Sequence, residues 1–161
     1  MKKEEIEELK EYLLETEEDI KFKDEYDDVL IGYAERFDNR FMPMYEGINT
    51  FLFKTPEESI QQATTLSDSV CEFPGLEESV VGYMILEDGK ISLLHDKEKL
   101  LNNLAKDYEN DGMEIDDEDD SYYSQAYQWY DFNIIGTGLT DMTTPSFACT
   151  EEYPLPVASN S

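Results

Sequence analysis

Apolar residues in the first part of the chain recur at helical spacing. Ile6, Leu9 and Leu13 stand three or four residues apart among Glu and Lys, so their side chains fall on one face of an α-helix. We expect a helix over 2–18 that packs this thin stripe on the body and keeps its other faces in water. The acidic, aperiodic stretch that follows makes 1–28 an N-terminal helix and linker.

Two later segments have the pattern of β-hairpins. In 29–46, an apolar run leads to the turn residues Asp38-Asn39-Arg40, and Pro43 in the returning arm favours an edge strand or a bulge. In 79–95, the two arms flank Asp88-Gly89, a dipeptide that favours a tight hairpin turn.

The two hairpins align without gaps at an offset of 50 residues. The identical pairs are Gly32/Gly82, Tyr33/Tyr83 and Asp38/Asp88, and a helix is predicted after each hairpin. The alignment raises the hypothesis of a duplicated ββα unit. The alternative is that both segments follow the common sequence rules of hairpins.

Capping residues mark the starts of three further helices. Thr55 is a capping residue followed by Pro56, which suits the first helical position. Asp96 and Ser121 precede segments with apolar residues at helical spacing. The predicted helices cover 55–66, 97–108 and 122–133.

Together these elements predict an α+β domain. A small antiparallel sheet of two hairpins plus a late edge strand, expected at 144–149, carries three or four helices, mostly on one face. Residues 48–53 fit a further short strand. We expect the compact domain over 29–150 and a flexible tail over 151–161.

The charge balance bounds the partners of the protein. Its 161 residues include 12 Lys and Arg against 39 Asp and Glu, a net charge of −27. With 40% apolar residues the chain can still build a core, so it is not expected to be disordered as a whole. Direct binding to nucleic acid or to an anionic membrane is not expected, because the acidic field repels phosphate.

Cysteine and histidine usage gives little sign of catalysis or of a metal site. The amino terminus is charged, unlike a signal peptide, and Cys71 and Cys149 are too few for a disulfide framework, so we expect reduced thiols in the cytoplasm. His95 is the only histidine and lacks ligands at zinc-site spacing. We place it at a strand end. No nucleophile elbow or phosphate-binding glycine loop occurs, and an enzyme is not expected.

An acidic run over 107–120 offers the one candidate for cation binding. Part of it fits a calcium loop, with Gly112 at the sharp turn. The ligands would be Asp107, Glu109, Asp111 and Glu118. Glu114 stands where such a loop has a small apolar residue, and the loop is unpaired. A solvated acidic loop is the simpler interpretation, so no cofactor is expected, and millimolar Ca²⁺ binding is the alternative.

The overall charge supports a second interpretation. Carboxylates spread over a rigid surface give the field of a nucleic-acid backbone, so a basic protein that binds DNA or RNA would bind this one instead. The residues expected to carry this binding are Asp116, Asp117, Glu118, Asp119 and Asp120, with Trp129 as an aromatic anchor. The alternatives are an acidic interaction module without nucleic-acid mimicry, and charge that serves solubility alone.

The stretch from Val80 to Phe147 carries a series of short motifs: His95-Asp96, Leu104, Gly112-Met113, Ala126, Tyr130-Asp131-Phe132-Asn133-Ile134-Ile135-Gly136 and Thr144-Pro145-Ser146-Phe147. With these motifs it resembles a family of uncharacterised small acidic bacteriophage proteins. His95 stands where the family has an aromatic residue, and an extra acidic stretch follows Met113. The resemblance implies a phage or prophage origin and no particular activity.

Charge and resemblance lead to one expectation about function. The protein is expected to be a phage-type inhibitor or decoy in the cytoplasm of an infected or lysogenic bacterium. Its target would be a basic nucleic-acid-binding host protein, such as a defence nuclease. A homodimer would suit mimicry of a longer duplex.

Overall fold

The computed structural model describes residues 2–16, 20–36, 40–73, 75–112, 114, 121–133, 145–151 and 153–156. Its strands are β1 (Leu30–Arg36), β2 (Arg40–Tyr45), β3 (Thr50–Leu52), β4 (Val80–Ile85), β5 (Ile91–Asp96) and β6 (Ser146–Ala148). Its α-helices are α1 (Lys3–Thr16), α2 (Pro56–Leu66), α3 (Lys97–Asn110) and α4 (Tyr122–Asn133). The 3-10 turns η1 (Asp24–Val29) and η3 (Glu77–Ser79) precede β1 and β4. The predicted α+β class is confirmed.

The predicted helix starts are confirmed by their capping hydrogen bonds. The Thr55 hydroxyl accepts from the Glu58 N–H at 3.1 Å at the start of α2. Asp96 accepts from the Lys99 N–H at 3.2 Å at the start of α3. The Ser121 hydroxyl accepts from Ser124 in the first turn of α4. These local signals placed the helices to within about two residues.

The sheet differs from the predicted antiparallel arrangement. Its six strands follow the order β2-β1-β6-β5-β4-β3, so β6 is central and the expectation of a late edge strand is wrong. Strand β6 pairs antiparallel with β1 and parallel with β5. It therefore joins the two hairpins, which do not pair with each other. Strand β2, which contains Pro43, does lie at an edge.

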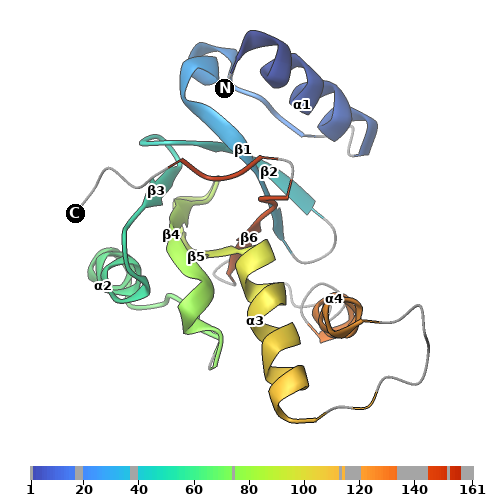
Figure 1. The fold of residues 1–161 in the computed structure, drawn as a ribbon. Helices are drawn as coiled ribbons and strands as arrows, with labels where there is room; N and C mark the ends of the chain where they lie inside the picture. The colour runs from blue at the N-terminus through green and yellow to red at the C-terminus, as the bar shows by residue number, and fades with distance from the viewer. Residues whose placement is uncertain are drawn as a thin grey trace.

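The curled sheet has an apolar inner face and an outer face covered by helices (Figure 1). The inner cluster consists of Ala34, Met44, Leu52, Met84, Leu94 and Ala148, all buried. Outer side chains pack against α1 near Tyr33, against α3 and α4 near Phe147, and against α2 near Tyr83. The helices thus lie on one face of the sheet, as the sequence predicted.

The two hairpins match in register and in their irregularities. Leu30 pairs with Tyr45 in the first hairpin and Val80 with His95 in the second, an offset of 50 residues for both partners. Each hairpin has a register shift just before its glycine, Gly32 or Gly82. Each also follows a 3-10 turn. A shared bulge and a shared turn support duplication beyond the common rules of hairpins.

The equivalent helix precedes each hairpin, which corrects the predicted ββα unit. The buried positions Leu9 and Leu13 of α1 correspond to Ser59 and Ala63 of α2, and all four side chains are fully buried. Helix α1 ends at Thr16 and α2 ends at the equivalent Leu66. Helix α3 has no such counterpart, because a short turn and β3 follow β2 in the first half.

The third strands of the two halves are also equivalent. Thr50 of β3 pairs antiparallel with Met84, and Ala148 of β6 pairs antiparallel with the equivalent Ala34. Each third strand also makes a parallel pair with the preceding strand of its own half: Glu46 with Thr50, and Asp96 with Ala148. The repeated unit is therefore a helix, a hairpin and a third strand that inserts beside the other half.

Asn49 draws the two edges of the sheet together. Its side-chain nitrogen donates to the Pro43 carbonyl at 3.0 Å, and its side-chain oxygen accepts from the Tyr45 N–H at 2.8 Å. The amide thus satisfies the backbone of β2 as a neighbouring strand would. Because the Asn49 carbonyl also accepts from Ile85 of β4, this residue links β2, at one edge, to β4, the second strand from the other edge.

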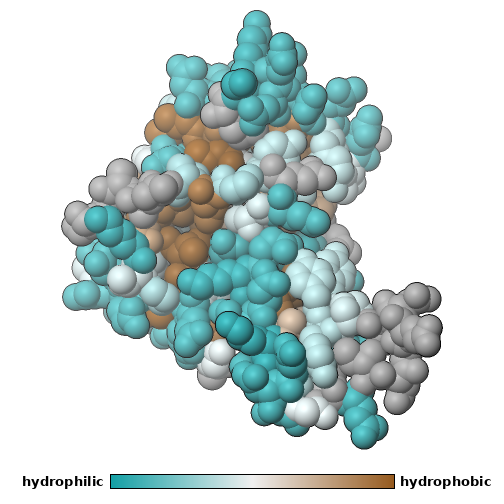
Figure 2. All heavy atoms as spheres, viewed as in Figure 1, coloured by the Kyte–Doolittle hydropathy of each residue, from teal (hydrophilic) through white to brown (hydrophobic). Residues whose placement is uncertain are grey.

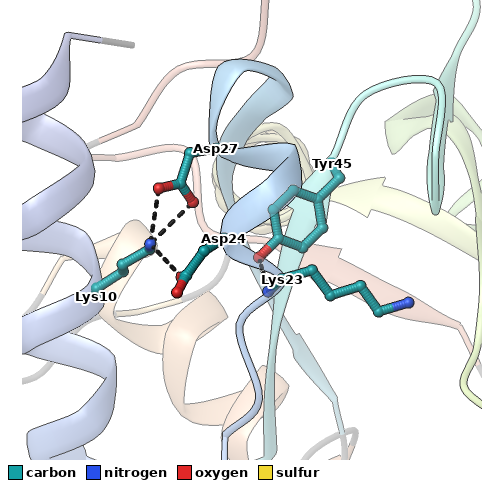
Figure 3. A network of polar contacts seen from close by, with 5 residues as sticks. All are labelled: Lys10, Lys23, Asp24, Asp27 and Tyr45. Carbon is teal, nitrogen blue, oxygen red and sulfur yellow. Dashed lines mark hydrogen bonds and ion pairs between the residues drawn. The ribbon is translucent and has the colours of Figure 1, made fainter.

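An ionic contact fixes α1 to the sheet (Figure 3). Lys10 contacts the carboxylates of Asp24 and Asp27 in η1, each at 2.8 Å. Beside them, the Tyr45 hydroxyl accepts from the Lys23 N–H at 2.8 Å. Together with its buried leucines, this contact makes α1 part of the folded body.

Candidate functional site

Most residues predicted to bind a partner lie outside the described residues. They are Asp116, Asp117, Glu118, Asp119 and Asp120, and their role stays a prediction. Trp129, the predicted anchor, lies on α4 and packs half-buried against the apolar cluster between α3 and α4. Part of its side chain therefore remains in contact with solvent.

The predicted calcium ligands do not form a loop in the part that is described. Helix α3 continues through Asn110, so Asp107 and Glu109 occupy a helical turn. Gly112 has a φ of 74°, as a sharp turn requires. No group of three or more His, Cys, Asp or Glu in the described ranges is placed to hold a metal ion, and Glu118 lies outside them. Calcium binding stays a prediction.

Carboxylates dominate the surface of the fold. Glu35 is the one buried acidic residue among those the structure describes. Figure 2 shows hydrophilic side chains over α1 and much of the face in view. The exposed acids of α1 are Glu4, Glu5, Glu7, Glu8, Glu11 and Glu15. Because these carboxylates stay hydrated, the fold presents most of the charge that its sequence encodes.

Two cations that could offset this charge lie inside the protein. The Lys97 ammonium contacts Glu35 at 2.8 Å, with 12% and 9% of the two side chains exposed. Tyr130 donates a hydrogen bond to the same carboxylate at 3.2 Å. Burial alone would lower the pKa of Lys97, but the charge and hydrogen bond of Glu35 outweigh it and raise that pKa. The pair joins α3 and α4 to β1.

Arg36 is the second internal cation. It is 5% exposed, and its Nη1 donates to Ser92 at 3.0 Å and to Ser146 at 2.7 Å. The equivalent positions in the other half hold Leu86, Met42 and Ile48. The polar group at this end of the sheet is therefore replaced by apolar residues in the other half. The hydroxyls bind the guanidinium and hold β1, β5 and β6 together.

His95 lies near the end of β5, as predicted, in a buried pair with Ser79. Its Nδ1 lies 2.7 Å from the Ser79 hydroxyl, which donates to the Leu76 carbonyl at 2.9 Å. The hydroxyl therefore accepts from Nδ1–H, which leaves Nε2 as the unprotonated nitrogen. Nε2 is buried without a hydrogen-bond partner, and the ring stacks on Phe147. This environment favours the neutral imidazole.

Acid is expected to destabilise the fold through His95. Burial lowers its pKa from 6.5 to about 4, so the unfolded chain binds the proton more tightly. The neutral imidazole therefore contributes about 3 kcal/mol to the free energy of unfolding. This contribution is complete above pH 6.5 and is lost as the pH falls through 4. Urea unfolding between pH 7 and 4 measures it.

His95→Phe is the control for that titration. The carboxylates titrate in both proteins, so the difference between the two curves isolates the imidazole. We expect wild type to lose stability relative to the variant as the pH falls. Parallel curves would mean that His95 titrates normally in the folded protein.

The cysteines do not line the cavity found among the described residues. Burial raises the pKa of Cys149 to about 12, which holds the thiol protonated and unreactive. Cys71 is half-buried, and neither cysteine is part of a disulfide. A cavity of about 280 Å³ lies between η3 and α3, and neither His95 nor Cys149 lines it.

Sequence reasoning missed the internal roles of Glu35, Arg36 and Lys97. One signal was available: Glu35-Arg36 directly follows the apolar run of β1, although charged residues at a strand end are usually exposed. Nothing in the sequence linked them to Lys97 or Ser146.

Comparisons with known proteins add no family. The chain matches no protein-family model, no curated protein and no solved structure. No helix within the described ranges is long and apolar enough to span a membrane.

Proposed function

We propose that the protein is a non-enzymatic acidic decoy that occupies the nucleic-acid site of a basic host protein. The distribution of charge carries this proposal. All described acidic residues except Glu35 are at least partly exposed, whereas Arg36 and Lys97 are engaged inside the fold. A basic groove that binds phosphates would meet hydrated carboxylates in their place.

The exposed face of α1 suits this role. Glu4, Glu8, Glu11 and Glu15 are three or four residues apart, so they follow one side of the helix. The helical rise places successive carboxylates roughly 5 Å apart along the axis, of the same order as the ~3.4 Å rise between phosphates of one DNA strand. The sequence resemblance to phage proteins points to a defence protein as the target.

The proposal is tested by affinity capture from bacterial lysate at low salt. We expect a specific nucleic-acid-binding protein that elutes with a salt step and that duplex DNA displaces, because both compete for the same cations. Poly-glutamate of equal charge serves as the competitor control and should displace it less. Elution of abundant basic proteins alone, without displacement by duplex, would assign the charge to solubility.

Charge reversal locates the binding. Changing Asp116, Asp117, Glu118, Asp119 and Asp120 to Lys is expected to abolish capture while Tm stays the same or rises, since fewer like charges repel. A second variant reverses five acids of α1, Glu4, Glu7, Glu8, Glu11 and Glu15, for an equal change in net charge, and so tests the face of this helix separately. Equal loss in both variants would mean that the global field governs binding. Survival of capture in both would contradict the decoy function.

A further inference from the structure

The duplication separates a repeated scaffold from an added part. In the first half, residues 46–49 suffice to connect β2 to β3. In the second half, the equivalent connection between β5 and β6 contains α3 and α4. Because the short connection joins the equivalent strands without a helix, α3 and α4 are not required by the strand topology. We call residues 97–145 the insertion.

The insertion has its own small core. Leu100, Leu101, Ala126 and Tyr130 form a buried cluster on Phe147 of β6. The position equivalent to Phe147 in the first half is Asn49, a polar residue that bonds to β2. The apolar side chain at this site therefore accompanies the insertion and gives it a surface on which to pack.

The outer side of α4 carries aromatic surface that this core covers only in part. Phe132 is 81% exposed, the largest exposure among the described apolar side chains. Trp129, three residues earlier, lies beside it on the helix and is half-buried. Figure 2 shows a pale surface of intermediate hydropathy over α4, next to hydrophilic α3. We call Trp129 and Phe132 the aromatic edge.

Charge indicates what would bind there. The exposed acids of the insertion include Asp107, Glu109, Asp111, Glu114 and Asp131. Two other aromatic residues of α4 contact a cation of α3. The Lys97 ammonium lies 5.1 Å from the ring centre of Tyr127 and 4.9 Å from that of Tyr130. Two aromatic rings of α4 thus already contact a cation, the ammonium of α3 that pairs with Glu35. Arginine suits such a surface best, since its planar guanidinium both stacks on rings and pairs with carboxylates.

We propose that the aromatic edge of α4 is the anchor for an arginine-rich protein surface. The proposal rests on the proposed function and assigns binding to the insertion, with α1 contributing long-range attraction. Trp129 and Phe132 would contact guanidinium planes, and the exposed carboxylate of Asp131, between them in the sequence of α4, would pair with their charge. Central aromatic anchors of this kind commonly dominate the energy of an interface.

The test uses the full chain and a defined probe. Trp129 is the only tryptophan, so its fluorescence reports directly on the aromatic edge. We expect saturable change on titration with a nona-arginine peptide at physiological salt, and several-fold weaker binding of nona-lysine. Phe132→Ala is expected to weaken nona-arginine binding about tenfold. Leu66→Ala, at a 57% exposed apolar residue of α2, is the matched control and should leave it unchanged.

The outcomes separate this proposal from the decoy function. Equal binding of both peptides, wild-type affinity in Phe132→Ala, or an equal loss in Leu66→Ala would overturn the aromatic edge as the anchor. Duplex-competed capture from lysate could still succeed in that case, and the decoy function would stand. If capture from lysate failed while Phe132→Ala still weakened nona-arginine binding, the decoy function alone would be overturned.

Discussion

Replacing Lys97 with Met is expected to lower the free energy of unfolding by about 3–5 kcal/mol. The substitution leaves the Glu35 carboxylate in a site where 9% of its side chain is exposed. Tyr130 would remain its hydrogen-bond donor, but one phenol does not replace a cation. Urea denaturation at neutral pH measures the loss.

Two controls identify its cause. Lys99→Met removes an exposed ammonium from the same helix and should cost less than about 1 kcal/mol. Adding Glu35→Leu to Lys97→Met should restore most of the stability, because replacing both members of a buried pair with apolar residues is often neutral. If the double variant were no more stable than Lys97→Met, loss of packing and not an unpaired charge would explain the effect.

Gly82→Ala is expected to cost about 4 kcal/mol or more. A Cβ atom at Gly82 would lie 2.0 Å from the carbonyl oxygen of Phe51. This oxygen belongs to the backbone of β3, so relief requires β3 to move away from β4. Thermal or urea unfolding measures the cost, and loss of the fold would appear as an absent transition.

Gly112→Ala separates this clash from the general cost of substituting a glycine. Gly112 has a φ of 74° and open space around the added Cβ, so its substitution should cost about 1 kcal/mol for the left-handed backbone alone. An equal cost at both positions would contradict the steric argument. The counterpart of Gly82 in the first half is Gly32, which also lies close to another segment. A Cβ atom added at Gly32 would lie 3.3 Å from the Cβ atom of Tyr153.

Features set by adjacent residues could be predicted from the sequence. Thr55 and Asp96 start helices through bonds to residues three positions later, and the Asp88-Gly89 turn joins β4 to β5. The position of β6 could not be predicted in this way. Its three residues carry little local signal, and their neighbours, β1 and β5, are fixed by pairing over long sequence distances.

The duplication was only partly visible for a similar reason. Identities survive in the hairpins, where Gly32 and Gly82 meet steric limits. In the helices, equivalent buried positions differ in chemistry, as Leu9 against Ser59 and Leu13 against Ala63 show. A hydrophobic pattern therefore reveals α1 and hides its relation to α2.

The acidic surface could be predicted from the charge balance alone. The internal positions of Lys97 and Arg36 could not, because such residues are usually exposed.

The pairing of each third strand with the other half has a consequence for synthesis on the ribosome. Strand β1 obtains its central neighbour only after Ser146–Ala148 has emerged from the exit tunnel. Until then, the nascent chain holds an unpaired strand edge, the feature through which partly made proteins aggregate. The acidic helix α1 precedes β1 in the chain and emerges before it. Its charge would keep neighbouring nascent chains apart during this interval.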